Sequence, residues 1–594
     1  MNQVLGEMKA KFIVIAAVMM TAAAWGYTYN WTGAAGNDDF NDEANWEAEG
    51  SASSDPVYRF PGTGKVGSVV RLTDDFTATQ IIFTNAADQA TLTLDLGGHA
   101  ITLFSTFSSR YCFYNRSPLV LTNGAFSVQS PYPGAFWGLS DIDDLKVSFL
   151  DMRLECPTYY TSSYYKTLSR KSLYFKDSFV TNFPGQELLG SNDEIVFDHC
   201  LYSHKPYKKH FGFGNGVTNA TLRFSNGCTF DRYDYQYVFQ AFDNAVGNRV
   251  IIDSGTELPF FGSTLRHTLN GTNSVFAISN AYVNGYASVG GCSNALIFSE
   301  AAYTNTDANS GMSVSGVGNK VLFDSVQDRI SFYYLNLSNT KKTRDMCLEL
   351  ADNTVLSNKS FNFRPYTSDG THLLLGTNCV LRLGYLMMYT DGTALSTNAL
   401  FEVNEDSTLL IDGQYTTSGF FGHNTRLVLN NGTFRYRGGG SYMVSWAGTT
   451  VELNGDKAKY IVDGYINFGR EVAAHPELYG VLKFRPGPTG YGGETPILLK
   501  NVNSYLTLGT NTVFKFDLRD YLRDKRVRHH RIPLMTGDPS KWKDGFRPNL
   551  ARLTETLEIK PKGWTKNEQV IYDNKKNAVC LDFDFNLGLM ILVR

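Results

Sequence analysis

Charged residues are scarce in this chain of 594 residues: Lys, Arg, Asp and Glu together make up 19% of it. The formal net charge is only −3, so the composition indicates no general affinity for nucleic acid or for anionic membranes. Cysteines are also few, eight in all, and none stands in a Cys-x-x-Cys pair. We therefore expect no zinc site, and no other metal or cofactor.

Long apolar runs are missing as well. The run Phe12 to Ala23 has 12 residues, whereas a membrane-spanning helix needs about 20. Lys9 and Lys11 precede this run, and the small residues Ala22 to Ala24 and Gly26 close it. That order of parts is typical of a secretory signal peptide. We expect residues 1–26 to be a signal peptide and the protein to be periplasmic, cell-surface or extracellular, with no transmembrane segment in the mature chain.

Catalytic signatures are equally hard to find. The sequence has no Gly-x-Ser-x-Gly, Walker, His-Glu-x-x-His, EF-hand or Gly-His-Gly pattern. The segment Val196 to Cys200, VFDHC, resembles the Trp-Ile-Asp-His strand of pectate lyases. That resemblance implies further acidic calcium ligands and an arginine base, and neither follows here. We expect Asp198 to cap a corner of the chain and His199 to point outward.

What the chain does contain is a repeated unit. Short alternating strands end at turns rich in Asn, Gly, Asp or Ser, as in Leu119–Gly124, Leu222–Gly227 and Leu427–Gly432. We call the last apolar residue before each turn the anchor. The anchors are Leu121, Phe149, Phe175, Phe197, Phe224, Ile252, Ile278, Phe298, Phe323, Leu350, Leu375, Val403, Leu429 and Leu453. Their 13 intervals span 332 residues, or 25.5 residues each.

A unit of this length with two or three short strands is the coil of a parallel β-helix, in which coils stack about 4.8 Å apart. Alternation places Leu222 and Phe224 inside and Arg223 outside. We predict an all-β chain folded as a right-handed parallel β-helix, a β-solenoid, of about 14 or more coils. Tandem antiparallel β-sandwiches are the alternative, because Asn-Gly pairs also indicate hairpins; sandwich hairpins, however, recur every ~8–12 residues.

Both ends of the chain depart from the repeat. We expect residues 27–110 to form an N-terminal cap and the first coils, 111–504 the solenoid, and 505–594 a charged capping region, because an open solenoid end exposes a sheet edge. Residues 505–594 hold 28 charged residues of 90, against 83 of 504 elsewhere. We interpret the charge run Tyr521–Arg531 as a solvated loop or helix. Val579–Asp584 and Leu589–Val593 look like a closing hairpin.

The motif W-x-G…F-N-x-x-x-N-W near the start consists of Trp31, Gly33, Phe40, Asn41, Asn45 and Trp46. It resembles the beginning of large exported β-helical proteins of diderm bacteria that are related to autotransporter passengers. The resemblance extends through the repeats to the closing strands. It implies a surface or adhesive factor of mostly unassigned activity. We expect neither a translocator barrel nor an LPxTG-like anchoring tail at the C-terminal end.

Aromatic clusters are the clearest signal for binding. Two groups of tyrosines lie close together in the sequence: Tyr159, Tyr160, Tyr164 and Tyr165, and then Tyr233, Tyr235 and Tyr237. In an extended segment the second group places all three rings on one face. Such rings suit stacking against sugars, with phenol hydroxyls as polar handles. Packing within loops and outer ladders are the other uses of such stretches.

The leading expectation is therefore a non-catalytic exported solenoid that presents a binding or adhesive surface. Its partners would be glycans, other components of a cell surface, or copies of itself. A β-helix polysaccharide lyase or glycoside hydrolase is an alternative of another class, and a structural surface-layer component is a third. Convergence of carboxylates, Arg and Lys in one groove would favour the enzyme.

The signal peptide leads to the first prediction. If the leader is removed after its small residues, the mature protein begins between Trp25 and Thr28. N-terminal sequencing of protein from the producing cell measures this directly. Retention of Met1 or Met8 in the exported protein would contradict the prediction.

Overall fold

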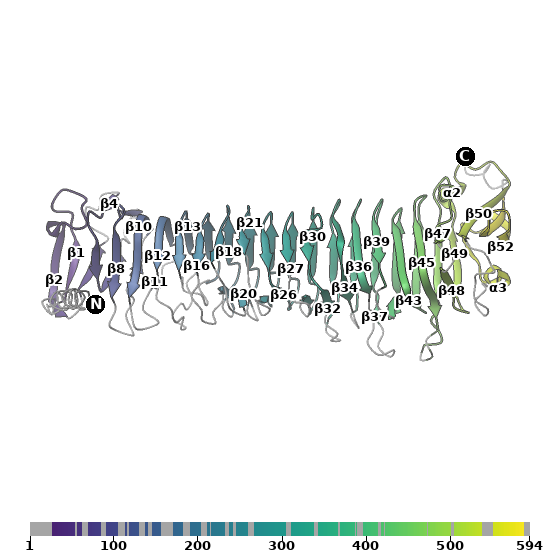
Figure 1. Ribbon diagram of the computed structural model, residues 1–594, viewed down its shortest axis with the longest axis horizontal. Coiled ribbons are helices and arrows are strands. Elements are labelled where there is room, and N and C mark those ends of the chain that lie inside the picture. Colours follow the sequence, from purple (N-terminus) through teal and green to yellow (C-terminus); the bar gives the residue numbers. More distant parts are fainter. Residues whose placement is uncertain are drawn as a thin grey trace, which may run out of the picture. The chain divides into compact units, whose positions relative to one another are not determined.

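The computed structural model describes residues 26–53, 56–61, 69–84, 91–104, 113–115, 118–129, 137–139, 145–155, 170–181, 190–203, 211–213, 216–231, 237–241, 245–258, 266–304, 311–337, 343–365, 369–386, 388, 396–413, 417–420, 422–471, 473, 475–500, 504–536 and 550–586. The chain is all-β, with 60% strand and 3% helix, and its parallel coils stack as a β-solenoid (Figure 1). The predicted fold class is confirmed. The chain divides into two compact units, residues 1–261 and 262–594.

In the first unit, strands of successive coils pair in parallel along three faces, which we call walls. Wall 1 consists of β4 (Val69–Arg71), β7 (Leu92–Asp95), β10 (Leu119–Gln129), β12 (Lys146–Glu155), β13 (Ser172–Lys176), β15 (Glu194–Asp198), β18 (Thr221–Ser225) and β21 (Arg249–Asp253). Wall 2 consists of β5 (Phe76–Ala78), β8 (Ala100–Phe104), the second halves of β10 and β12, β14 (Phe179–Thr181), β16 (Leu201–Ser203), β19 (Thr229–Asp231) and β22 (Glu257–Leu258). Wall 3 holds β3 (Val57–Pro61), β6 (Gln80–Thr84), β9 (Phe113–Asn115), β11 (Trp137–Leu139), β17 (Phe211–Phe213) and β20 (Tyr237–Ala241).

The second unit repeats this arrangement. Wall 1 consists of β24 (Val275–Ser279), β27 (Ala295–Ser299), β30 (Lys320–Asp324), β33 (Cys347–Leu350), β35 (His372–Leu375), β38 (Leu400–Val403), β42 (Thr425–Asn430), β44 (Thr449–Asn454), β46 (Val481–Arg485), β49 (Val513–Asp517) and β51 (Glu558–Lys560). Wall 2 consists of β25 (Tyr282–Asn284), β28 (Ala302–Thr304), β31 (Ile330–Ser331), β34 (Val355–Arg364), β36 (Val380–Leu386), β39 (Thr408–Ile411), β43 (Thr433–Trp446), β45 (Lys459–Arg470) and β47 (Ile497–Leu499). Wall 3 holds β23 (Arg266–Leu269), β26 (Tyr286–Val289), β29 (Met312–Val314), β32 (Tyr334–Leu337), β40 (Thr417–Phe420), β48 (Tyr505–Leu508) and the second halves of β34, β36, β43 and β45. Two short strands, β37 (Ser396–Thr397) and β41 (Gly422–His423), pair just before wall 1.

All 14 anchors lie on wall 1. Within each unit every anchor is the Cα partner of the next, from Leu121 to Ile252 and from Ile278 to Leu453. None is more than 2% exposed. The rings of Phe149, Phe175 and Phe197 stack with centroids 4.7 and 4.8 Å apart. In-register stacking therefore makes the anchors one continuous apolar column inside each unit.

The coils amount to about 11 turns, slightly fewer than the 14 or more expected. An anchor marks only a wall 1 strand, whereas a complete turn needs strands on all of its walls. The 14 anchors therefore mark 14 of the wall 1 strands and do not count complete turns.

Two corners flank the wall 1 strands, and both use left-handed backbone. Five residues before the anchor, φ is positive at Arg170, Asn192, Asn219, Gly247, Asn273, Ser293, Gly318, Asp345, Gly370, Asn398, Asn424 and Gly448. Two or three residues after it, φ is positive at Asn123, Asp151, Asp177, His199, Asn226, Ser254, Asn280, Glu300, Ser325, Asn353, Asn378, Asp406, Asn431 and Gly455. Gly, Asn and Asp tolerate this conformation best, which explains the Asn- and Gly-rich turns of the sequence.

The opening motif forms a packed cluster at the start of the first unit. Trp31 and Phe40 are buried, and Trp31 meets Trp46 edge to face with ring centroids 5.1 Å apart. Buried Asn45 donates from Nδ2 to Oδ1 of Asn37 at 2.7 Å and accepts the N–H of Ala35 at 3.0 Å. The strands β1 (Gly26–Trp31) and β2 (Trp46–Ser53), joined through the short helix η1 (Glu43–Asn45), pair antiparallel, and β1 runs parallel to β3. The motif thus stabilises the change from antiparallel to parallel pairing.

The last described residues of the second unit also leave the coil pattern. The strand β53 (Ala578–Phe585) lies between β50 (His529–Thr536) and β52 (Thr565–Asp573) and is antiparallel to both. Of two short helices, α2 (Arg519–Leu522) precedes β50, and α3 (Leu550–Glu555) lies between β50 and β52 in the chain. The expected hairpin is therefore wrong in its partner, because β53 pairs with β52 and β50; Leu589–Val593 lies outside the described residues. Most of the charge run Tyr521–Arg531 is helix and loop as expected, since it starts in α2 and continues without regular structure to Arg528. Only its last three residues lie in a strand, β50, where His529 and Arg531 pair with Asp582 of β53.

Among the residues that the structure describes, no helix is both long and apolar enough to cross a membrane.

The corner geometry gives a second prediction. Asn280 is exposed, has φ +45°, and donates its backbone N–H to the carbonyl of Ser299 at 2.9 Å. Because a β-branched residue is strained at positive φ, Asn280→Val should destabilise the protein by about 1–2 kcal/mol. Asn280→Gly, the matched control, should leave stability nearly unchanged, since both variants keep the backbone hydrogen bond. Urea unfolding of the two variants measures the difference, and equal midpoints would contradict it.

Candidate functional site

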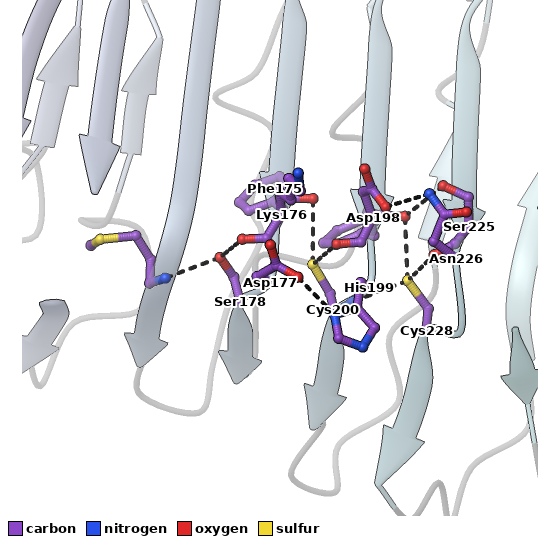
Figure 2. Close-up of polar contacts among 12 residues, drawn as sticks. Phe175, Lys176, Asp177, Ser178, Asp198, His199, Cys200, Ser225, Asn226 and Cys228 are labelled. Carbon is purple, nitrogen blue, oxygen red and sulfur yellow. Dashed lines mark hydrogen bonds and ion pairs between the residues drawn. The ribbon is translucent and has the colours of Figure 1, made fainter. Parts of the chain in front are cut away.

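The lyase-like segment lies at the corner between wall 1 and wall 2 of the first unit. Asp198 is the last residue of β15, and His199 follows at the corner with φ +52°. The Asp198 carboxylate accepts the hydroxyl of Tyr174 on β13 at 2.5 Å. It also accepts the Nδ2 amide of Asn226, just after β18, at 2.6 Å (Figure 2). Asp198 thus bridges three successive coils, which is a structural task.

These hydrogen bonds also determine the protonation state of the Asp198 carboxyl. Burial raises the pKa of the Asp198 carboxyl, but the hydrogen bonds from Tyr174 and Asn226 outweigh burial and hold it below its usual range. The same hydrogen bond to Asp198, with partial burial, raises the pKa of Tyr174 to about 12. Asp198 is therefore a fixed anion beside a neutral phenol. Neither group is suited to transfer a proton near neutral pH.

His199 points outward, and 67% of its side chain is exposed. Its Nδ1 lies 2.7 Å from Oδ1 of Asp177, which occupies the equivalent corner position one coil earlier. Ser178 follows Asp177 in the chain, so that the three residue types of a serine-hydrolase triad lie together. The Ser178 hydroxyl, however, is buried and donates to the backbone carbonyls of Lys176 and Phe149. It is not presented to the imidazole, so the group has no nucleophile.

Inside this corner, small hydrogen-bonding side chains form a column, which we call the corner column: Ser178, Cys200 and Cys228 (Figure 2). Each donates to the carbonyl of the anchor one coil earlier: Cys200 to Phe175 at 3.4 Å and Cys228 to Phe197 at 3.3 Å. The backbone N–H of Cys200 also donates to Sγ of Cys228 at 3.3 Å. Both cysteines are free thiols and buried. The two cysteines therefore stack on adjacent coils without a disulfide between them.

The outer faces of the walls carry charges that pair along the stack. Glu452 of β44 accepts Arg426 of β42 at 2.6 Å and Lys483 of β46 at 2.8 Å. Burial raises the pKa of Glu452, but its hydrogen bonds to Lys483 and Arg426 outweigh burial and lower it. Arg223 and Asp253 pair in the same way in the first unit, at 2.6 Å. In such ladders the ionic groups neutralise one another instead of converging on a ligand.

Metal-binding groups do not gather either. Nowhere in the described ranges do three or more His, Cys, Asp or Glu side chains come together in a way that would hold a metal ion.

The tyrosine clusters lie mostly outside the described residues. Tyr159, Tyr160, Tyr164 and Tyr165 fall between β12 and β13, and Tyr233 and Tyr235 fall between β19 and β20. Tyr237 opens β20, and only its backbone is described. Their role in binding stays a prediction.

One unusual pair was missed in the sequence. Lys171 and Asp193 lie inside the first unit with side chains 3% and 2% exposed, and Lys171 Nζ is 3.6 Å from Asp193 Oδ2. Burial lowers the pKa of Lys171 and raises the pKa of Asp193, and in each case the partner's charge opposes the shift. The signal was present: each residue stands four positions before its anchor, Phe175 or Phe197, on the inward side of the corner.

No family model, no curated protein and no solved structure matches this chain.

The corner column gives a third prediction. The hydrogen bond with Cys228 and burial hold the pKa of the Cys200 thiol above its usual value, and reaction with alkylating reagents requires both exposure and thiolate. In native protein Cys200 and Cys228 should therefore be alkylated at least ~10-fold more slowly than after unfolding in urea, because reaction must wait for local opening. Cys292, which is partly exposed, is the internal control. Peptide mapping without reductant should show unlinked peptides; native reactivity equal to that of Cys292 would contradict the burial.

Proposed function

We propose that this protein is a non-catalytic, exported solenoid whose binding surface is formed by the variable segments of its coils. The observation that carries the proposal is that coils differ in length mainly in one part, outside wall 1 and its two corners. The walls would then be a scaffold, and the connections would carry recognition, as loops on rigid scaffolds commonly do.

The constant part of the coil is short and well defined. From the first corner residue to the second, wall 1 spans eight or nine residues in every coil that has both corners described. The distance between anchors nevertheless varies from 20 residues, between Ile278 and Phe298, to 28, between Leu375 and Val403. All but one residue of this variation therefore lies in the remainder of the coil. In repeat proteins, insertions of this kind map to one face, which is often the binding face.

The tyrosine clusters belong to this variable part. Six of the seven candidate residues stand between a wall 2 strand and the next described strand, and the seventh opens a wall 3 strand. An aromatic ring contributes a flat apolar face and a tyrosine adds a hydroxyl, a combination that suits the face and rim of a sugar ring. We therefore favour a glycan as the ligand.

The walls support a scaffold role rather than catalysis. Asp198 and His199 are each held by residues of neighbouring coils. A lyase of this architecture must neutralise a uronate carboxylate and abstract a proton with a positioned base. The described residues offer a fixed anion at Asp198 and an exposed imidazole at His199, and no metal-binding group beside them.

The fourth prediction tests the binding surface. Purified mature protein on a glycan array should bind at least one glycan class. Tyr235→Ala should weaken that binding about 5-fold, the equivalent of ~1 kcal/mol for one stacked ring. Tyr235→Phe is the matched control, because it keeps the ring and should retain most of the affinity. Equal binding by the wild type and both variants would show that Tyr235 is not part of the binding surface.

The same purified protein can also be tested for catalysis. Incubation with acidic polysaccharides and calcium should release no unsaturated uronates, and His199→Ala should change nothing. Calcium-dependent ultraviolet absorbance that is lost in His199→Ala would overturn the proposal in favour of an enzyme.

A further inference from the structure

We propose that Lys171 and Asp193 condense to an intramolecular amide, so that two neighbouring coils of the first unit are covalently joined between Lys171 Nζ and Asp193 Cγ. The inference is independent of the binding function. It rests on the position of the two side chains in the stack, on their burial, and on the residue types that occupy the same position in other coils.

The two residues are stacked neighbours. Ser172 and Glu194, which follow them directly, are Cα partners in the parallel pair β13–β15. Both side chains therefore enter the interior from the same point of adjacent coils. With Lys171 Nζ only 3.6 Å from Asp193 Oδ2, the amine lies within reach of the carboxyl carbon. Reacting groups held this close and in one orientation have a large effective concentration.

Burial favours the neutral forms that the reaction needs. In water an amine and a carboxylic acid are stabilised as ammonium and carboxylate, and this solvation opposes amide formation. At 3% and 2% exposure that solvation is absent, and the desolvation of a buried ion pair can exceed the mutual attraction of its charges. Condensation removes both charges from the interior.

The backbone around Asp193 is arranged for the transition state. Oδ1 accepts the N–H of Lys171 at 2.8 Å, and Oδ2 accepts the N–H of Gly190 at 2.6 Å. When Nζ attacks Cγ, negative charge develops on the retained oxygen Oδ1, where the Lys171 N–H already donates. A donor in that place stabilises an oxyanion without reorganisation.

The step balances within the pair. One proton of the Lys171 ammonium passes to Oδ2, and the free amine forms the Nζ–Cγ bond. A second proton moves from Nζ to Oδ2, the Cγ–Oδ2 bond breaks, and one water leaves. The third hydrogen stays on the amide nitrogen. No oxidant, reductant or metal takes part.

The product matches what other coils already contain. The positions equivalent to Asp193, four residues before the anchor, hold Asn248, Asn294 and Asn319. Each accepts a backbone N–H of the preceding coil through Oδ1, at 2.8, 2.8 and 2.7 Å respectively. An amide is thus the group that this corner accommodates elsewhere. Condensation turns Asp193 into an amide that keeps the same acceptor bond.

The test is peptide mapping by mass spectrometry of the full-length folded protein. The wild type should yield a branched peptide containing Lys171 and Asp193, lighter by one water than the two linear peptides together, and the bond Lys171–Ser172 should resist trypsin. The double variant Lys171→Met/Asp193→Asn places the asparagine of the other coils in this position, so it should fold and should give only linear peptides.

A second variant tests whether the loss of water is specific to the buried pair. Lys320 and Glu349 form a comparable pair between adjacent coils, 2.6 Å apart but in solvent, with side chains 37% and 25% exposed. The branched peptide should persist in Lys320→Met, and in the wild type no branch should join Lys320 to Glu349. Separate linear Lys171 and Asp193 peptides from folded wild-type protein would overturn the proposal and leave an ordinary buried ion pair. A water loss that survives in the double variant would overturn it as well.

Discussion

The in-register hydrogen bonding of wall 1 is the constraint on which the rest of the structure depends. The backbone N–H and C=O groups of a parallel strand are hydrogen-bonded only if the strand of the next coil lies in register beside it. The chain must therefore turn at the same two points in every coil, and those turns use left-handed backbone that only a few residue types tolerate. Asn280, His199 and Glu300 occupy equivalent corner positions, so side chains of very different chemistry accept the same conformation. The stack stabilises the corner more than the residue type does.

Stacking has a consequence for polar groups inside the coil. Every interior position faces its counterpart one coil away, so a buried polar side chain finds its partner along the stack rather than across the core. Asn319 Oδ1 accepts the backbone N–H of Asn294 in this way, and Cys228 Sγ accepts the backbone N–H of Cys200 at the opposite corner. A charge in such a column can be neutralised only by a neighbour in the same column. Lys171 and Asp193 are that case.

Wall 1 could be predicted from the sequence because its signal is local. Alternation fixes which residues face inward, and Asn or Gly marks the turn that follows, so that the 14 anchors named from the sequence all lie on wall 1. The interior column four residues before the anchor was missed, because Lys171, Asp193 and Asn248 share no residue type, and only the register reveals that they are equivalent. The pairing of β53 with β52 and β50 was missed for a related reason. Partners at the end of a stack are chosen by tertiary contact and not by the repeat.

The same constraint limits where function can reside. A side chain on a wall is surrounded above and below by its counterparts, and ladders such as Arg426–Glu452–Lys483 show the result: charges pair with each other at 2.6 and 2.8 Å. Asp198 and His199 carry the residue types of a catalytic strand, yet neighbouring coils engage them in the same manner. Residues that recognise a ligand therefore need to lie in segments that are not paired in register with the next coil. In each coil such segments lie only outside the part between the two corners. For this reason a ligand for such a solenoid should be inferred from the connections between strands and their lengths. The composition of the walls is a poorer guide.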